Sequence, residues 1–246
     1  TRPCNFHYGD YANRLIKTKN ALPLAGNKKI AFDKIEVFYR VKKKITKSNT
    51  YSISEIKKLH KYLRLQVSSD LKKITKKRKN INHIKFDKPK IMGILNVTPD
   101  SFSDGGLYFD EDDAIQHANL MINSGASIID IGGESTRPGS KTVNEKDEWE
   151  RVEGVISKLK KKFPKIPISL DTRKSYVMKN GIKNKINIIN DVSGLKFDKN
   201  SFKIINNKKI PFVLHHMQGT PNSMQINPKY DDVLLEIYDF FEKKIN

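Results

Sequence analysis

This sequence contains a single cysteine, Cys4, among its 246 residues. One thiol cannot form an intrachain disulfide or a cysteine metal cluster, so a disulfide-stapled fold is excluded and a reducing compartment is favoured. No window approaches the roughly 18 consecutive apolar residues of a membrane span, and the basic start lacks the apolar stretch of a signal peptide. We therefore expect a soluble cytoplasmic protein. The start at Thr1 instead of methionine predicts a fragment or a processed product.

Acidic residues are scarce in the first third of the chain. Residues 1–88 hold 24 Lys and Arg against 6 Asp and Glu, whereas the rest hold 23 against 21, so nearly all of the net charge of +20 lies in this first third. Basic segments of this kind often bind nucleic acid. However, no RNA-binding signature or zinc-finger spacing is present, and 39 Lys against 8 Arg is typical of an AT-rich genome. We predict a solvated basic surface with no nucleic-acid partner.

Few chemical motifs occur in residues 1–88. Alternating apolar residues predict a strand over residues 30–41. Ser52 and Glu55 form a capping box, which predicts a short amphipathic helix carrying Ile56, Leu59 and Leu63. The lysine-rich stretch from about Gln66 to Lys90 is typical of a linker. The prediction is a small α+β or irregular amino-terminal extension and linker over residues 1–88, without catalytic residues.

A repeated order of strand, polar loop and helix begins after Pro89. Apolar runs predict strands over residues 91–97, 127–131, 166–170, 186–189 and 210–214. Apolar spacings of three and four predict helices around residues 114–122, over 144–163 with Asn144 as its cap, and over 231–245. A further helix begins near Lys174. Alternating units of this kind indicate parallel strands covered by helices.

Polar residues follow the carboxyl end of every predicted strand. These segments are residues 96–106, 132–139, 171–172, 190–191 and 215–219. A TIM barrel places its active site at this rim, whereas an open doubly wound sheet binds ligands at a switch point. Only five of eight barrel units fit before Asn246, so the spacing leaves both architectures open.

Specific strings in this half of the chain resemble dihydropteroate synthase. Residues 91–106 read IMGILNVTPDSFSDGG and are similar to the first signature of that family, and residues 132–139 read GGESTRPG and are similar to its second loop. Three later segments resemble its third, fourth and fifth elements: Asp171-Thr172, Ile189-Asn190-Asp191 and residues 214–224. The resemblance implies an α/β fold, a (β/α)8 TIM barrel, incomplete here with about five βα units, over residues 89–246.

The resemblance also implies an activity. Dihydropteroate synthase is a transferase of folate biosynthesis that joins 6-hydroxymethyl-7,8-dihydropterin diphosphate to p-aminobenzoate, releasing diphosphate, and it is the target of sulfonamides. The alternative is a pterin-binding methyltransferase barrel that passes a methyl group to a corrinoid. The long first loop and the string STRPG favour the synthase. A non-catalytic fragment with a basic nucleic-acid-binding segment is the other alternative.

Two residues are expected to hold the pterin. Asp171 is a candidate catalytic and substrate-binding carboxylate, because it can accept two pterin N–H groups while stabilising positive charge. Asn190 beside it offers an acceptor and donors. Each could instead cap a helix.

The loops supply the remaining expected roles. Asn96 would be a single neutral ligand of Mg²⁺, the one expected cofactor, or else stabilise its own loop. Arg137 would bind diphosphate or the benzoate carboxylate. Asp104 would face the developing pterin cation when the first loop closes. The other substrate-binding candidates are Phe102, Ser135, Thr136, Pro138 and Met217.

Other polar residues near the rim receive no catalytic role. Adjacent strand residues point to opposite faces, so at most one of His215 and His216 reaches the rim, and His216 is expected to form a structural hydrogen bond. Glu134 has no definite assignment. Asp130 is interpreted as a satisfied buried acid.

Three strings of the resembling family, Asp-Pro-Gly-Phe-Gly-Phe-Gly-Lys, Ser-Arg-Lys-Ser and Arg-x-His, are not found before Asn246. We therefore expect the 246 residues alone to be inactive. Their inner face should lack partners across the barrel axis, with Ile91, Leu95, Ile129, Ile168 and Ile188 or their neighbours unfilled. The substrates would be small molecules, and a homodimer of the full-length protein stays open.

Overall fold

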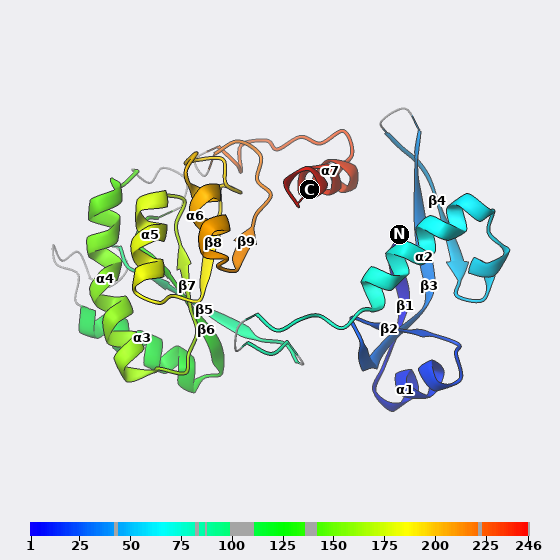
Figure 1. The fold of residues 1–246 in the computed structure, drawn as a ribbon, viewed down its shortest axis with the longest axis horizontal. Coiled ribbons are helices and arrows are strands. Elements are labelled where there is room, and N and C mark those ends of the chain that lie inside the picture. The colour runs from blue at the N-terminus through cyan, green and yellow to red at the C-terminus, as the bar shows by residue number, and fades with distance from the viewer. Residues whose placement is uncertain are drawn as a thin grey trace. The chain divides into compact units, whose positions relative to one another are not determined.

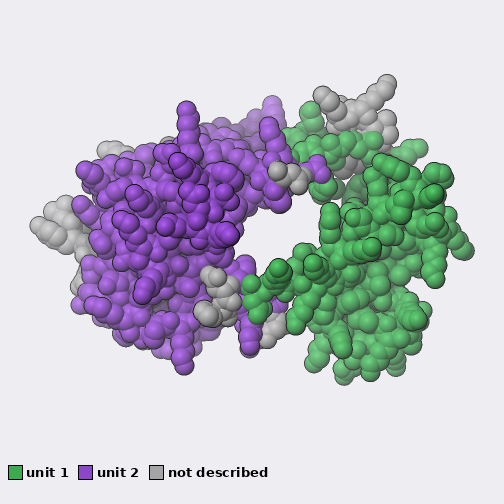
Figure 2. Space-filling model, viewed as in Figure 1, with its two compact units in different colours: residues 1–80, 231–239 green, residues 81–230, 240–246 purple. Residues whose placement is uncertain are grey.

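The computed structural model describes residues 1–41, 44–81, 84–86, 88–98, 111–135, 142–220 and 223–245. The chain divides into two compact units, coloured separately in Figure 2. One is Thr1–Asn80 with Asp231–Asp239, and the other is Ile81–Tyr230 with Phe240–Asn246. Within the described ranges, no helix combines the length and the apolar character that crossing a membrane would require.

The first unit is an antiparallel sheet with helices. Its strands are β1 (Arg2–Tyr8), β2 (Leu22–Leu24), β3 (Asn27–Val41) and β4 (Lys44–Ser52), and its helical segments are α1 (Gly9–Lys17), η1 (Glu55–Lys58) and α2 (Lys61–Thr75). The long strand β3 pairs with each of the other three. Phe32 and Ile35 of β3 pack with Val67 and Leu71 of α2, so this unit has its own apolar core.

Two expectations for this unit need correction. The capping-box contact forms, since Glu55 Oε2 accepts hydrogen bonds from the Ser52 backbone N–H (2.7 Å) and hydroxyl (2.7 Å). However, the segment that follows is the one-turn 3₁₀ helix η1, and the α-helix begins only at Lys61. The linker expectation is wrong as far as Thr75, because Val67 and Leu71 bury one face of α2.

The second unit is a parallel α/β assembly. Its strands are β5 (Ile91–Asn96), β6 (Ala126–Gly132), β7 (Ile168–Asp171), β8 (Ile188–Asp191) and β9 (Phe212–Leu214). Its helices are α3 (Glu111–Asn123), α4 (Glu145–Lys162), α5 (Ser175–Lys183), α6 (Ser201–Lys208) and, shared with the first unit, α7 (Val233–Ile245). The sheet order is β5-β6-β7-β8-β9 (Figure 1). Strands that follow chain order without a reversal are those of a (β/α)8 barrel, because a doubly wound sheet reverses at its switch point.

One face of this sheet carries the main apolar core. Leu95, Ile129, Ile131, Ile168 and Leu170 all pack there, at 2% exposure or less. The same core takes its helical side chains from α3, α4, α5 and α6. The expectation that Leu95, Ile129 and Ile168 line the inner face is therefore wrong, because these side chains point outward to the helices.

The opposite, inner face is more polar. Ile94, Asp130, Ser169 and Ile188 lie side by side on it in strand register. Ile188 packs with Ile84 and Ile128 in a small apolar cluster, whereas Ile94 is 64% exposed. The next inner-face position toward the carboxyl end is where the candidate site residues lie.

Candidate functional site

A row of four residues crosses the carboxyl ends of four neighbouring strands. Asn96 of β5 pairs with Gly132 of β6, Gly132 pairs with Asp171 of β7, and Asp171 pairs with Asn190 of β8. Paired residues of parallel strands point to the same face, so the side chains of Asn96, Asp171 and Asn190 share the inner face at the rim. The prediction that these three residues lie at one rim is confirmed.

Gly132 leaves space within this row. A Cβ atom at this position would lie 3.6 Å from Asp171 Cβ and 3.7 Å from both Asn96 Oδ1 and Asp171 Oδ2. These are ordinary contact distances, so a side chain here would fill the gap between Asn96 and Asp171 without a severe clash. The absence of a side chain at Gly132 thus leaves Asn96 Oδ1 and Asp171 Oδ2 uncovered on this side.

Asp171 is held in an environment that disfavours its charge. Burial raises the pKa of Asp171 to about 7, and the negative charges of Asp130, Glu148, Asp191 and Glu134 contribute further in that order. An acid poised near neutrality can exchange its proton readily or be ionised by a cationic ligand. Asp171 does not cap α5: Lys174 occupies the cap position, and Asp198 accepts the hydrogen bond from Ser175 N (2.8 Å).

Asn190 is fixed by partners on both sides. Its Nδ2 donates to Asp130 Oδ2 (2.9 Å), and its Oδ1 lies 2.8 Å from His215 Nε2. Because an amide oxygen only accepts, His215 donates through Nε2. These side-chain bonds replace the helix-cap role that the sequence left open for Asn190.

Asp130 is buried but not fully satisfied. It is 5% exposed, and its Oδ1 has no hydrogen-bond partner. The hydroxyl of Ser169, which pairs with Asp130 in strand register, is also buried without a hydrogen-bond partner. The interpretation of Asp130 as a satisfied acid is therefore wrong for one of its two oxygens.

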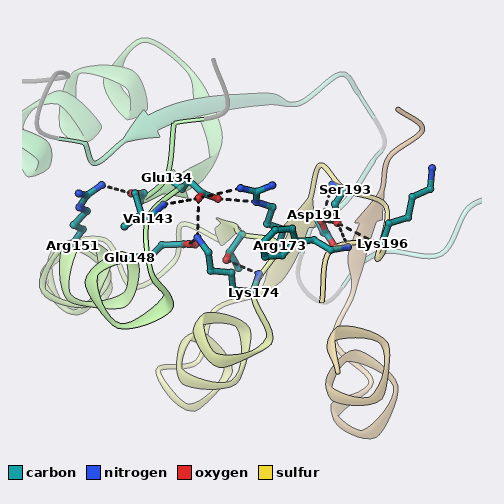
Figure 3. A network of polar contacts seen from close by, with 12 residues as sticks. Glu134, Val143, Glu148, Arg151, Arg173, Lys174, Asp191, Ser193 and Lys196 are labelled. Atoms are coloured by element: carbon teal, nitrogen blue, oxygen red, sulfur yellow. Dashed lines mark hydrogen bonds and ion pairs between the residues drawn. The ribbon is translucent and has the colours of Figure 1, made fainter. Parts of the chain in front are cut away.

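Glu134, which received no assignment from the sequence, is the centre of a charged network (Figure 3). It accepts from Arg173 Nε (2.9 Å) and Nη2 (3.2 Å), and it pairs with Lys174 Nζ (3.0 Å). Burial alone would raise the pKa of Glu134, but the bonds from Arg173 and Lys174 outweigh it and hold that pKa below its ordinary value. Glu134 also accepts from Val143 N (3.0 Å).

The network continues into α4. Lys174 Nζ also bonds Glu148 Oε2, and burial nevertheless raises the pKa of Glu148. Arg151 donates to the carbonyl of Gly133 (2.9 Å). A Cβ at Gly133 would lie 2.8 Å from the Glu148 carbonyl oxygen, so a glycine is required for this close approach. A sequence signal existed, since Glu134 and Arg173 each stand two residues beyond the ends of neighbouring strands.

The remaining predicted residues are placed as follows. Ser135 is half-buried directly after Glu134, and Met217 is half-buried with its carbonyl 3.4 Å from Lys196 Nζ. His216 forms the expected structural hydrogen bond, with Nε2 3.0 Å from the Tyr230 hydroxyl. Phe102, Asp104, Thr136, Arg137 and Pro138 lie outside the described residues.

Among the described residues of this rim, Asn96 offers a neutral oxygen ligand to a divalent cation. Asn96 is exposed, and its Oδ1 would lie 3.7 Å from a Cβ atom placed on Gly132. No group of three or more His, Cys, Asp or Glu side chains converges as a metal site among the described residues. One neutral ligand fits an ion such as Mg²⁺ that keeps several waters and takes its charge partners from a substrate.

Comparisons with known proteins agree with this geometry. Residues 92–246 match the family model described as "Pterin binding enzyme". The chain is 47% identical over 157 residues to the dihydropteroate synthase of Escherichia coli strain K12, covering 64% of this chain and 55% of that protein. The matched part thus spans about half the length of such curated relatives.

Solved structures of dihydropteroate synthases are also similar to this chain. A Yersinia pestis dihydropteroate synthase in complex with a sulfonamide drug superposes with a TM-score of 0.61 at 42% identity, covering 66% of this chain and 58% of that one. The Xanthomonas albilineans enzyme with 4-aminobenzoic acid gives a TM-score of 0.58 at 40% identity, covering 65% and 55%. The second unit therefore has the fold of part of a TIM barrel.

Proposed function

Because this chain belongs to the pterin-binding enzyme family, we propose that it is part of a dihydropteroate synthase. That enzyme would join 6-hydroxymethyl-7,8-dihydropterin diphosphate to p-aminobenzoate and release diphosphate. The observation that carries the proposal is the row of Asn96, Gly132, Asp171 and Asn190 at one rim. It brings together amide and carboxylate groups that can form hydrogen bonds with the edge of a flat polar ring.

The reaction needs charge stabilisation more than acid–base chemistry. The arylamine is a weak nucleophile, so the rate depends on the departure of diphosphate and on positive charge developing on the pterin methylene. Asp171 would accept two N–H groups from the pterin edge, and its negative charge would favour the cation. With a pKa of about 7, Asp171 is readily ionised when such a ligand arrives.

Asn190 is neutral and would orient the pterin through hydrogen bonds. One N–H and the carbonyl oxygen are engaged with Asp130 and His215. Its second N–H and second lone pair stay available to the ligand. A pterin edge carries both donors and acceptors, so this pair of contacts would select a pterin over a ring with donors alone.

The other candidate residues would complete the proposed site. Arg137 would bind an anionic group of either substrate, and Asp104 would face the developing cation. Phe102, Ser135, Thr136, Pro138 and Met217 would edge the substrate pockets.

Mg²⁺ is part of the proposal. Asn96 would hold it, and the ion would neutralise charge on the diphosphate when bound. We further propose that the enzyme works in the cytoplasm, which the lone Cys4 fits. A homodimer of the full-length protein stays a prediction that light scattering can test.

The test uses the complete natural gene product. It should form dihydropteroate from the pterin diphosphate and p-aminobenzoate, and sulfonamides should compete with p-aminobenzoate. Asp171→Asn should lower kcat by roughly a hundredfold, because the charge that meets the cation is lost while shape is kept. Wild-type turnover in that variant would contradict the assignment of Asp171.

Binding order provides a second measurement. Calorimetry should show p-aminobenzoate and Mg²⁺ binding only after the pterin diphosphate. Tight binding of p-aminobenzoate to the free enzyme would count against the proposal. Methyl transfer from methyltetrahydrofolate to a corrinoid would instead support the methyltransferase alternative.

A further inference from the structure

Asp130 is a buried acid that forms a hydrogen bond with a residue of the candidate site. It lies on the inner face of β6, one pleat below the rim, and is 5% exposed. One oxygen, Oδ2, accepts from Asn190 on β8, two strands away. Burying an acid costs folding free energy unless hydrogen bonds replace its lost water contacts. Among the described residues, the hydrogen bond of the Asp130 side chain goes to a candidate site residue, which suggests a role in that site.

The chemistry of Asp130 determines which way the Asn190 carboxamide faces. Asp130 Oδ2 accepts a hydrogen bond from the NH₂ group of Asn190, which turns that group toward Asp130. The carbonyl oxygen then faces His215, 2.8 Å from Nε2. The reversed carboxamide would set its oxygen against the carboxylate of Asp130, and the two would repel each other.

The orientation matters because Asn190 shares its register row with Asp171. Its unused N–H and lone pair can meet a ligand in only one order along the rim. Reversing the carboxamide exchanges donor and acceptor, so a ring edge that fits one orientation is mismatched to the other.

We propose that Asp130 is a positioning residue, which acts through Asn190 by fixing its carboxamide in the orientation that binds the pterin. This inference rests on the proposed function, since it names the pterin edge as the group recognised. Asp130 would touch neither substrate nor metal. His215 would complete the arrangement by donating to the carbonyl oxygen.

The position of Asp130 relative to Asp171 supports this view. Among the charged neighbours of Asp171, Asp130 contributes most to raising its pKa, ahead of Glu148, Asp191 and Glu134. Asp130 therefore lies close to both pterin-binding candidates. The orphan hydroxyl of Ser169 lies beside it and provides a natural control, because Ser169 has no bond to Asn190.

The experiment is Asp130→Asn in the complete natural protein, with Ser169→Ala as the matched control. Asparagine keeps the shape but can donate as well as accept, so Asn190 is free to take either orientation. Binding of the pterin diphosphate, measured by calorimetry, should weaken by about tenfold, the scale of one charged hydrogen bond. The KM for p-aminobenzoate and the binding of pterin by Ser169→Ala should both stay at wild-type values.

A nuclear magnetic resonance measurement makes the test independent of activity. In the wild-type protein, His215 should carry its proton on Nε2, and in Asp130→Asn it should become a mixture of tautomers. This readout applies even if the protein makes no dihydropteroate, a result that would defeat the proposed function alone. Wild-type pterin affinity in a folded Asp130→Asn variant, or a wild-type His215 with bare Nε2, would overturn the inference.

Discussion

Asp171 is placed where its charge is unfavourable for folding. It is half-buried at the end of β7, where burial raises its pKa and four neighbouring carboxylates raise it further. Groups retained in such surroundings usually serve a ligand, because replacing them improves stability at the expense of function. The same residue should therefore limit stability and support binding.

The raised pKa of Asp171 predicts that the free energy of unfolding depends on pH. The pKa of Asp171 is about 7 in the folded chain against an ordinary 3.8. The folded state thus holds the proton more tightly, and the stability this provides is complete below pH 3.8 and lost as pH rises through about 7. Asp171→Asn cannot ionise, so its advantage in unfolding free energy over the wild type should grow by about 1.4 kcal/mol per pH unit between these limits.

The measurement is urea denaturation of both proteins at pH 5 and pH 8. Asp171→Asn should gain clearly more at pH 8. Asp112→Asn is the matched control, because Asp112 is exposed and its pKa is lowered by a hydrogen bond from Lys158. It should gain nothing at pH 8, and an equal gain from both variants would show that the loss of any carboxylate has this effect.

At the scale of residues, the sequence predicted which residues lie at the rim better than it predicted their hydrogen-bond partners. Asn96, Asp171 and Asn190 could be found because each ends or nearly ends an apolar strand. The bond from Asn190 to Asp130 could not, because it joins residues 60 apart and depends on which inner-face positions share a register. The roles assigned to Phe102, Asp104 and Arg137 stay predictions.

At the scale of elements, the start of α4 shows how one side chain defines a helix boundary. Asn144 Oδ1 accepts from Lys146 N (2.9 Å) and Asp147 N (3.0 Å), which satisfies two of the free N–H groups of the first turn. The predicted cap is confirmed. α4 also carries Glu148 of the charged network, so its start helps to place that residue.

We predict that Asn144→Ala lowers the free energy of unfolding by about 1 kcal/mol, the usual value of such a cap. Asn200→Ala is the control: Asn200 precedes α6 but forms no side-chain cap bond. Thermal melts of the two variants measure the difference. Equal losses would mean that the Asn144 bonds contribute nothing beyond asparagine itself.

Strand positions followed from the sequence more readily than face assignments. All five parallel strands were predicted to within about two residues, because apolar runs between polar loops are distinctive. Which side of each strand faces the helices was not predicted, because isoleucines such as Ile94 and Ile188 also stand on the inner face and hide the alternation. In α2 the spacing of Leu63, Val67, Leu71 and Ile74 is helical, but the many lysines obscured it. Short α6 was missed, with Ile205 its one buried large apolar residue.

At the scale of the whole molecule, the segment after α2 separates the two compact units along the chain. Lys76, Lys77, Arg78 and Lys79 are exposed and lie outside any helix or strand. Such backbone can enter a protease site, whereas helical backbone must first unfold. We predict that limited trypsin treatment cuts first at residues 76–79.

Mass spectrometry of the early products checks this prediction. The lysines at the end of α4 are the internal control, because Lys160, Lys161 and Lys162 remain in helix. Cleavage there as early as at residues 76–79 would indicate that the second unit opens easily. A stable product beginning near Asn80 is the expected result.

The basic first third leads to a prediction about charge alone. Its 24 cations should bind DNA weakly at low salt, and fluorescence anisotropy should show the affinity falling steeply to background at physiological ionic strength. Heparin should compete as well as DNA does. Sequence-selective binding that persists at physiological salt would make the first third a nucleic-acid-binding domain.

The strand order of the second unit has a consequence for synthesis on the ribosome. Each strand from β6 to β9 pairs with the strand made just before it, so the sheet can grow in the direction in which the nascent chain emerges. Translation at about 5–20 residues per second leaves seconds between successive strands, ample time for local pairing. When each of the strands β6 to β9 emerges, the strand it pairs with has already been made. Of these five strands, only β5 emerges before any pairing partner.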